Sequence, residues 1–229
     1  MRLTPALARR LGAELLGTGL LVTVVVGSGI AAQRLSPRDV GLQLLENSTA
    51  TVLGLTVLIL LFGPVSGSHF NPVVSVADWL LSRGKGKGIT GPEVIAYGLA
   101  QTIGAVGGAL LANTMYDVPA AFASHDRTDA RLWLGEVVAT AGLVLLIFAL
   151  VRSGRTPLAA PAVGAYIGAA YWFTSSTSFA NPAVTVGRMF SDTFAGIAPG
   201  SVPGFVVAQV VGAAVGMGLV HSLFPEVES

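Results

Sequence analysis

Two short stretches combine residue types that could act on a passing solute. They read Ser68-His69-Phe70-Asn71-Pro72-Val73 and Ser178-Phe179-Ala180-Asn181-Pro182-Ala183. An Asn at a helix N-cap accepts from a free backbone N–H, and a Pro at the first helical position has no N–H to leave unpaired. Each Asn-Pro therefore predicts a helix start. The Asn amide also carries N–H donors that can bind a water or hydroxyl oxygen. A single Asn-Pro is common, whereas two copies at matching places indicate a site.

The composition restricts the remaining chemistry. Of 229 residues, 52% are hydrophobic and 11% are charged, which is typical of a membrane protein. The sequence has no cysteine, which excludes disulfides and thiolate sites, and its three histidines (His69, His125 and His221) are scattered. The formal net charge of +1 argues against a nucleic-acid partner. We find no nucleophile and no metal-ligand cluster, and we expect neither enzymatic activity nor a cofactor or metal.

Six apolar segments approach the ~20 residues that cross ~30 Å of hydrocarbon. They are residues 11–32, 48–64, 93–115, 132–151, 158–177 and 203–223. The first is too long for a signal-peptide core, so we expect a retained transmembrane helix. The residues from each Asn-Pro onward, 71–82 and 181–190, are apolar but too short to cross and predict re-entrant half-helices. The sequence thus predicts an all-α membrane protein with one channel domain over residues 1–229.

A repeat relates two halves of the chain, at about 1–115 and 131–224. Ala100-Gln101 and Ala208-Gln209 are followed by glycines at equal spacings, and Glu14-x-x-x-Thr18 matches Glu136-x-x-x-Thr140. An odd number of spans per half inverts the second half relative to the first. The two half-helices then meet N-terminus to N-terminus, where their partial positive charges disfavour cations. Without a carboxylate ring or carbonyl cage, this arrangement suits a small neutral hydroxylated solute.

Basic residues predict the orientation. Eight lie on the side of the termini and five on the other side. The first group is Arg2, Arg9, Arg10, Arg83, Lys85, Lys87, Arg152 and Arg155, and the second is Arg34, Arg38, Arg127, Arg131 and Arg188. By the positive-inside rule, both termini are expected in the cytoplasm.

Three polar residues of the spans and loops allow two interpretations. Glu14 and Glu136 could form a proton relay in an ion-coupled transporter. Their symmetric placement favours structural support, in which each carboxylate accepts from free N–H groups of a re-entrant loop. His69 could respond to pH, but one histidine forms no cluster, and packing or hydrogen bonding of its loop is favoured.

The chain resembles the aquaporins, the major intrinsic protein family, over essentially its full length. The paired Asn-Pro-Ala boxes of that family correspond to Asn71-Pro72-Val73, where Val replaces Ala, and to Asn181-Pro182-Ala183. The positions of Glu14 and Glu136 match its paired buried glutamates. The resemblance implies a six-helix bundle with two half-helices, one pore per subunit, and a homotetramer. We expect the protein to lie in the cell membrane, and specifically in a bacterial inner membrane.

The sequence departs from the family where the selectivity filter is expected. Val184 stands where water-selective members and typical glycerol facilitators have Arg. Counting back from the boxes gives Thr51 (or Leu53 with a two-residue gap), Ala169 and Ser178 as the other filter residues. This filter would be wide, uncharged and free of His, Arg and aromatic residues. Arg188, one turn beyond Val184, could partly replace the missing charge, although a structural or surface role is favoured.

A bacterial branch of the family, proposed to carry metalloid hydroxides, is similar in the stretch from Phe173 to Pro182. We therefore expect a passive channel for small neutral solutes, namely glycerol-like polyols, water, and metalloid hydroxides such as arsenous acid. The alternatives are a water-selective channel and, less favoured, an ion-coupled transporter that uses Glu14 and Glu136.

Overall fold

The computed structural model describes residues 3–83 and 88–224, and its regular elements are all helical over these ranges. In chain order they are α1 (Pro5–Leu35), α2 (Val40–Ser66), α3 (Pro72–Ser82), α4 (Gly91–Met115), α5 (Ala130–Arg152), the 3-10 turn η1 (Thr156–Leu158), α6 (Ala159–Phe173), α7 (Pro182–Arg188), η2 (Pro199–Ser201) and α8 (Val202–Leu223). The predicted all-α class is confirmed. Arg2, Lys85 and Lys87, which entered the orientation prediction, lie outside the described residues.

Five of the long helices are long and apolar enough to cross a membrane: α1, α2, α4, α5 and the helix that ends at Leu223. The sixth, α6, has 15 residues and packs against α2 and α5. At 1.5 Å per residue it covers about 22 Å, and the adjacent turn η1 extends it at its N-terminus. The chain therefore crosses the bilayer several times.

Helix α2 starts eight residues before the predicted apolar segment. Its first turns contain Gln43 and Asn47, which lower the hydropathy of the segment, yet both side chains are buried. The Asn47 amide donates to the carbonyl of Val25 (2.8 Å) and to the hydroxyl of Ser28 (2.9 Å). These polar groups are satisfied inside the protein, so the helix continues through them.

Glycines bring the long helices into contact in the same way in both halves. A Cβ on Gly104 would lie 2.2 Å from the carbonyl oxygen of Leu15 in α1, and a Cβ on Gly108 would lie 2.0 Å from that of Gly19. In the second half, a Cβ on Gly212 would lie 2.5 Å from the carbonyl oxygen of Val137 in α5. Only glycine permits this approach, which holds α1 against α4 and α5 against α8.

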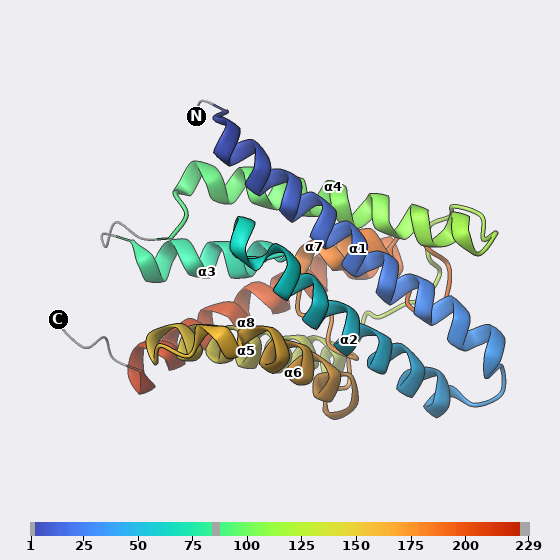
Figure 1. The fold of residues 1–229 in the computed structure, drawn as a ribbon. Helices are drawn as coiled ribbons and strands as arrows, with labels where there is room; N and C mark the ends of the chain where they lie inside the picture. The colour runs from blue at the N-terminus through green and yellow to red at the C-terminus, as the bar shows by residue number, and fades with distance from the viewer. Residues whose placement is uncertain (1–2, 84–87, 225–229) are drawn as a thin grey trace.

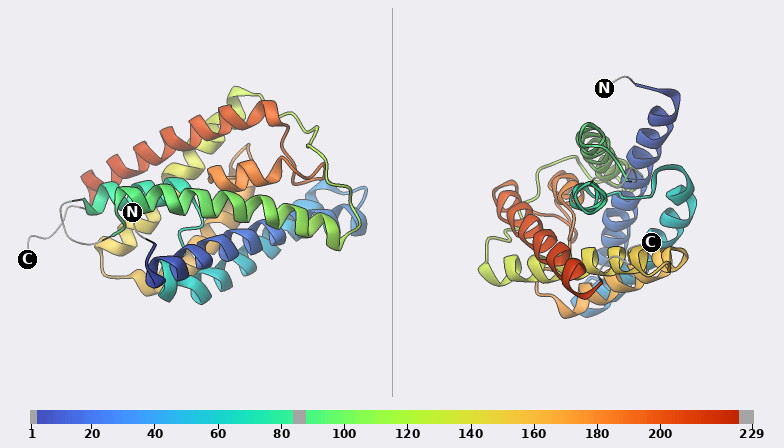
Figure 2. Two further views of the ribbon diagram at one scale, coloured as in Figure 1. Left: turned by 90° about the horizontal axis from the view of Figure 1, so that it is seen from above. Right: turned by 90° about the vertical axis from the view of Figure 1, so that its left-hand side faces the viewer.

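The short helices α3 and α7 enter the bundle from opposite ends (Figure 1). Both pack between α4 and α8, as the view along the bundle shows (Figure 2). Helix α1 begins and α8 ends at the same end of the bundle, the end at which α3 also finishes (Figure 1). The order of two long helices, a short helix and a long helix thus occurs twice along the chain.

Candidate functional site: paired half-helices around a cavity

A cavity of about 290 Å³ passes the point where α3 and α7 meet. Aliphatic side chains from α1, α2, α5 and α6 form most of its wall. Its two ends differ in the polar residues that line them. The α3 end is lined by Asp78, Val151, Thr156 and Ala159, and the α7 end by Thr51, Tyr171, Ser178, Val184 and Arg188.

Asn71 and Asn181 join the half-helices at the centre of this cavity. Asn71 caps α3 by accepting from the N–H of Val73, and Asn181 caps α7 in the same way. Each Nδ2 donates across the junction: that of Asn71 to the carbonyl of Ala180, and that of Asn181 to the carbonyl of Phe70, both at 2.7 Å. Because each amide has two N–H donors, one remains for the cavity that both residues line.

Pro72 and Pro182 occupy the first position of α3 and α7, where no backbone N–H is required. Val73 and Ala183 follow them and are buried away from the cavity. Val73 packs with Phe148 in a separate hydrophobic cluster. The Val in place of Ala in the first box therefore contributes to the packing behind the half-helix and does not itself line the cavity.

The loops before both half-helices adopt the same strained backbone. Ser68 and Ser178 both have φ of 51°, and Phe70 and Ala180 have φ of 49° and 48°. Such left-handed conformations cost about 1–3 kcal/mol at non-glycine residues and persist where the surroundings fix them. Here a buried carboxylate fixes each loop.

Glu14 accepts from the N–H groups of His69 (3.0 Å) and Phe70 (2.7 Å). Glu136 accepts from the equivalent N–H groups of Phe179 and Ala180, both at 2.8 Å. Both glutamates are fully buried, and neither lines the cavity. Their oxygens are turned to the loops and not to the cavity.

Each glutamate also receives a glutamine amide from the last long helix of its half. The Gln101 amide lies 2.7 Å from Glu14 and 3.1 Å from the hydroxyl of Ser75, and Gln209 repeats this pattern with Glu136 and Thr185. His69 lines the cavity, and its Nδ1 lies 3.0 Å from the same Ser75 hydroxyl. The half-helix, its loop and the outer helix are thus one hydrogen-bonded unit.

Three of the four predicted filter residues lie together at the α7 end. Thr51, Ser178 and Val184 line the cavity, and the Thr51 hydroxyl is 3.2 Å from that of Tyr171. Ala169 is exposed on the outward face of α6, and Leu53, the alternative to Thr51, is 63% exposed. The placement of Ala169 at the constriction is therefore wrong. Two residues turn a helix by about 200°, so Tyr171 faces the cavity where Ala169 faces outward.

Arg188 also lies at this end, although the sequence favoured a structural or surface role for it. It is 3% exposed and lines the cavity. Its Nε donates to the carbonyl of Ala195, and its guanidinium carbon is 3.4 Å from the ring centroid of Phe179. With Tyr171 and Phe179 also in the wall, the prediction of a filter without aromatic or Arg residues is wrong. The four-residue spacing from Val184 could have indicated that Arg188 reaches the cavity. Residues four apart lie on one face of a helix, and helical side chains lean toward the N-terminus of their helix.

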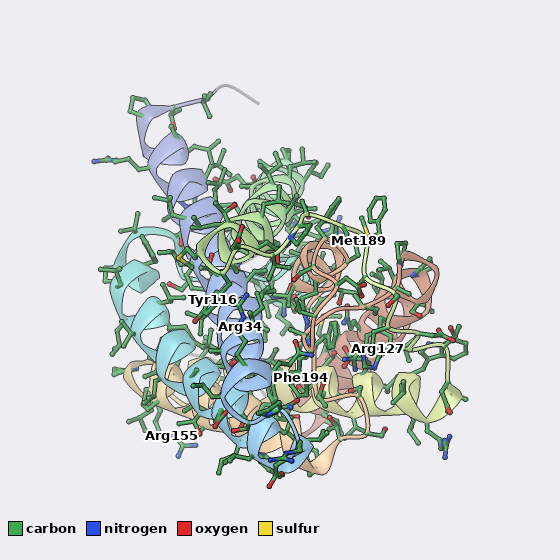
Figure 3. All side chains as sticks on the ribbon, turned by 90° about the vertical axis from the view of Figure 1, so that its right-hand side faces the viewer. Arg34, Tyr116, Arg127, Arg155, Met189 and Phe194 are labelled. Carbon is green, nitrogen blue, oxygen red and sulfur yellow. The ribbon has the colours of Figure 1, made fainter. Side chains whose placement is uncertain are left out.

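Polar loops cover the α7 end (Figure 3). Asp192 accepts from the N–H and the hydroxyl of Ser124, both at 2.9 Å, and these bonds lower the pKa of Asp192. Hydrogen bonds from Arg131 lower the pKa of Asp129 to about 2. Arg127, labelled in Figure 3, is buried among these loops, and burial lowers the pKa of its guanidinium.

In the described ranges no three His, Cys, Asp or Glu residues are grouped to hold a metal ion. A helical bundle in which two half-helices meet inside an apolar cavity is the architecture of a membrane channel. Residues 2–179 match the model of the family described as "Major intrinsic protein". The chain belongs to the major intrinsic protein family.

Relatives cover nearly the whole chain. It is 49% identical to the aquaglyceroporin AqpS of Rhizobium meliloti (strain 1021), over 95% of this chain and 91% of the relative. It is 32% identical to the glycerol uptake facilitator protein of Pseudomonas aeruginosa, over 94% and 88%. The X-ray structure of the aquaglyceroporin from Plasmodium falciparum has the same fold, with a TM-score of 0.72, 20% identity, and coverage of 96% of this chain and 97% of that chain.

Proposed function

We propose that this chain is a passive channel for small neutral solutes, namely glycerol-like polyols, water, and metalloid hydroxides such as arsenous acid. The observation that carries the proposal is the junction of Asn71 and Asn181 inside a cavity with mainly aliphatic walls. Two relatives named for glycerol and for aquaglyceroporin activity support the polyol class.

The junction favours neutral solutes for an electrostatic reason. Both half-helices present their N-termini, and hence partial positive charge, to the centre of the cavity. A solute oxygen can accept from the free N–H of Asn71 or Asn181, while the opposite wall of residues such as Leu21 and Val163 offers no donor or acceptor. A cation gains nothing here to offset the loss of its hydration shell.

The charge distribution supports an orientation with both termini in the cytoplasm, and the bacterial relatives support placement in a bacterial inner membrane. Arg9, Arg10 and Arg83 lie at the end of the bundle where α1 begins and α3 finishes. The α7 end is then external. A homotetramer is part of the proposal, and the apolar outer face of α2, where Leu53, Leu60 and Leu61 are at least 60% exposed, supports contact with lipid or with neighbouring subunits.

Light scattering on proteoliposomes that contain the purified protein tests this function. Water, glycerol and arsenous acid should all permeate faster than through protein-free liposomes, without saturation at low millimolar concentration. A proton gradient should not drive accumulation. Uphill uptake that follows the gradient would support the ion-coupled alternative, and permeation of water alone would support a water-selective channel.

Val184→Arg tests the position of the filter. The added side chain would narrow the α7 end beside Thr51 and Ser178. We expect glycerol permeation to fall about tenfold, the effect of a barrier raised by ~1.4 kcal/mol, and water permeation to fall less. Equal loss of both in a protein that remains folded would place the constriction elsewhere.

A further inference from the structure

Two arginines from different elements converge on one aromatic ring at the α7 end. The guanidinium carbons of Arg127 and Arg188 lie 5.0 and 3.4 Å from the ring centroid of Phe179. Their Nε atoms donate to neighbouring carbonyls, that of Arg127 to Gly196 (3.1 Å) and that of Arg188 to Ala195. The same loop therefore positions both cations.

Neither cation has a carboxylate partner in the part of the chain that the structure describes. Arg127 and Arg188 are only 8% and 3% exposed. The acidic side chains of the neighbouring loops are already engaged: Asp126 with Thr128 and Ser201, and Asp192 with Ser124. Because buried charges in proteins are normally paired, two such cations without an acid indicate a place for an anion.

Free donors at this position face the cavity. No Nη atom of Arg188 has a hydrogen-bond partner among the described residues, and Arg188 lines the cavity. Ser178 lines it as well, is 3% exposed, and its buried hydroxyl is unpaired. The two Nη groups of an arginine form a planar fork that matches the two oxygens of a carboxylate. The Ser178 hydroxyl supplies a further donor.

We propose that Arg188 and Ser178, with Arg127 as a second positive charge, form a binding site for a small carboxylate-type monoanion at the α7 end of the pore. The proposal rests on the proposed channel function only in that the site lies in the permeation path. A bound anion occupies the filter and slows the passage of neutral solutes. Flux then depends on the anions of the medium on that side.

The experiment measures glycerol flux into proteoliposomes in two media of equal ionic strength. One contains ~10 mM sodium formate, and the other contains sodium gluconate in its place. A site of about 10 mM Kd is half-filled at this concentration, so formate should slow wild-type flux about twofold. Arg188→Leu should remove the effect of formate, and Ser178→Ala should weaken it. Arg131→Leu is the matched control, because the Arg131 side chain is 85% exposed and paired with Asp129. It should keep the wild-type response.

Formate-independent wild-type flux, or an equal effect of formate on Arg188→Leu, would overturn the anion site while the channel function stood. Absence of any glycerol flux would overturn the proposed polyol permeation, and the anion site would then be tested by binding alone. Thermal unfolding in detergent tests the site separately from transport: formate should raise the midpoint of the wild type and of Arg131→Leu but not of Arg188→Leu. Equal midpoints with and without formate in the wild type would overturn the proposal. If Arg188→Leu fails to fold, Arg127→Leu takes its place in both experiments. Arg127 does not line the cavity, so its replacement removes the second positive charge without changing the cavity wall.

Discussion

The two halves of the molecule share their support and differ in their lumen. In both, a buried glutamate accepts from two loop N–H groups and from a glutamine amide. The seventh residue after each Asn lines the cavity, but it is Asp78 in the first half and Arg188 in the second. The repeated contacts hold the half-helices in place, whereas the unrepeated side chains give the two ends of the cavity opposite charge.

A second difference lies behind the loops. A Cβ on Gly17 would lie 2.0 Å from the ring of Phe70, so a larger residue there would force the ring to move. The equivalent positions in the second half hold Ala139 and Ala180, both fully buried. The first half fills this space with a glycine and a phenylalanine, and the second half has two alanines there. The backbone geometry of the loops is the same in both cases.

The largest effect should come from the shared support. Glu14→Leu leaves two loop N–H groups, the Ser66 hydroxyl and the Gln101 amide without their acceptor. At about 1–3 kcal/mol for each unsatisfied buried donor, we expect at least about 3 kcal/mol of lost stability, and a similar loss for Glu136→Leu. Thermal unfolding in detergent measures both. A stable Glu136→Leu protein beside an unfolded Glu14→Leu protein would break the equivalence of the halves.

An intermediate effect should come from the exchanged packing. Gly17→Ala forces the Phe70 ring to move, and overpacking of this kind costs about 1–3 kcal/mol. The double variant Gly17→Ala/Phe70→Ala reproduces the residues of the second half. The double variant should lose about 1 kcal/mol less stability than the losses of Gly17→Ala and Phe70→Ala added together. A double-mutant cycle of unfolding midpoints measures this difference. Additive losses would show that the pair Gly17 and Phe70 cannot be exchanged for two alanines, as found at Ala139 and Ala180.

The smallest effect should come from a loop contact of the second half. Because the pKa of Asp192 is lowered in the folded protein, its bonds to Ser124 contribute stability above the ordinary carboxylate pKa of ~3.9. That contribution is lost as the pH falls through the lowered value. Hydrogen exchange at the Ser124 amide, corrected for its intrinsic rate, should therefore accelerate at pH 3 relative to pH 6. Asp192→Asn should show a smaller change between these two pH values.

Much of the fold could be predicted from apolar length and from the two Asn-Pro starts. The observed half-helices begin at Pro72 and Pro182, one residue after the predicted starts. The predicted span at 158–177 was too long, because α6 ends at Phe173 and the strained loop begins there. The boundary coincides with the polar residues Thr174 to Thr177, which the predicted span included.

The site was less predictable because rotation about a helix axis decides which residue faces the cavity. Counting without gaps named Thr51, which lines the cavity, and Ala169, which does not, whereas Tyr171 does. Arg188 was assigned a structural or surface role from its distance along the helix. Its burial depends on Phe179 and on the carbonyl of Ala195, which come from loops on either side of α7. No periodicity in the sequence indicates these contacts.

The crossed hydrogen bonds at the junction also constrain how the chain is made. Asn71 and Asn181 each donate to a carbonyl in the other half, across sequence separations of 109 and 111 residues. At about 5–20 residues per second, the ribosome reaches the second partner roughly 5–20 seconds after the first. During that interval the first re-entrant segment has only contacts within its own half, such as those to Glu14, Gln101 and Tyr97. The two hydrogen bonds at the junction can therefore form only after the second half has been made.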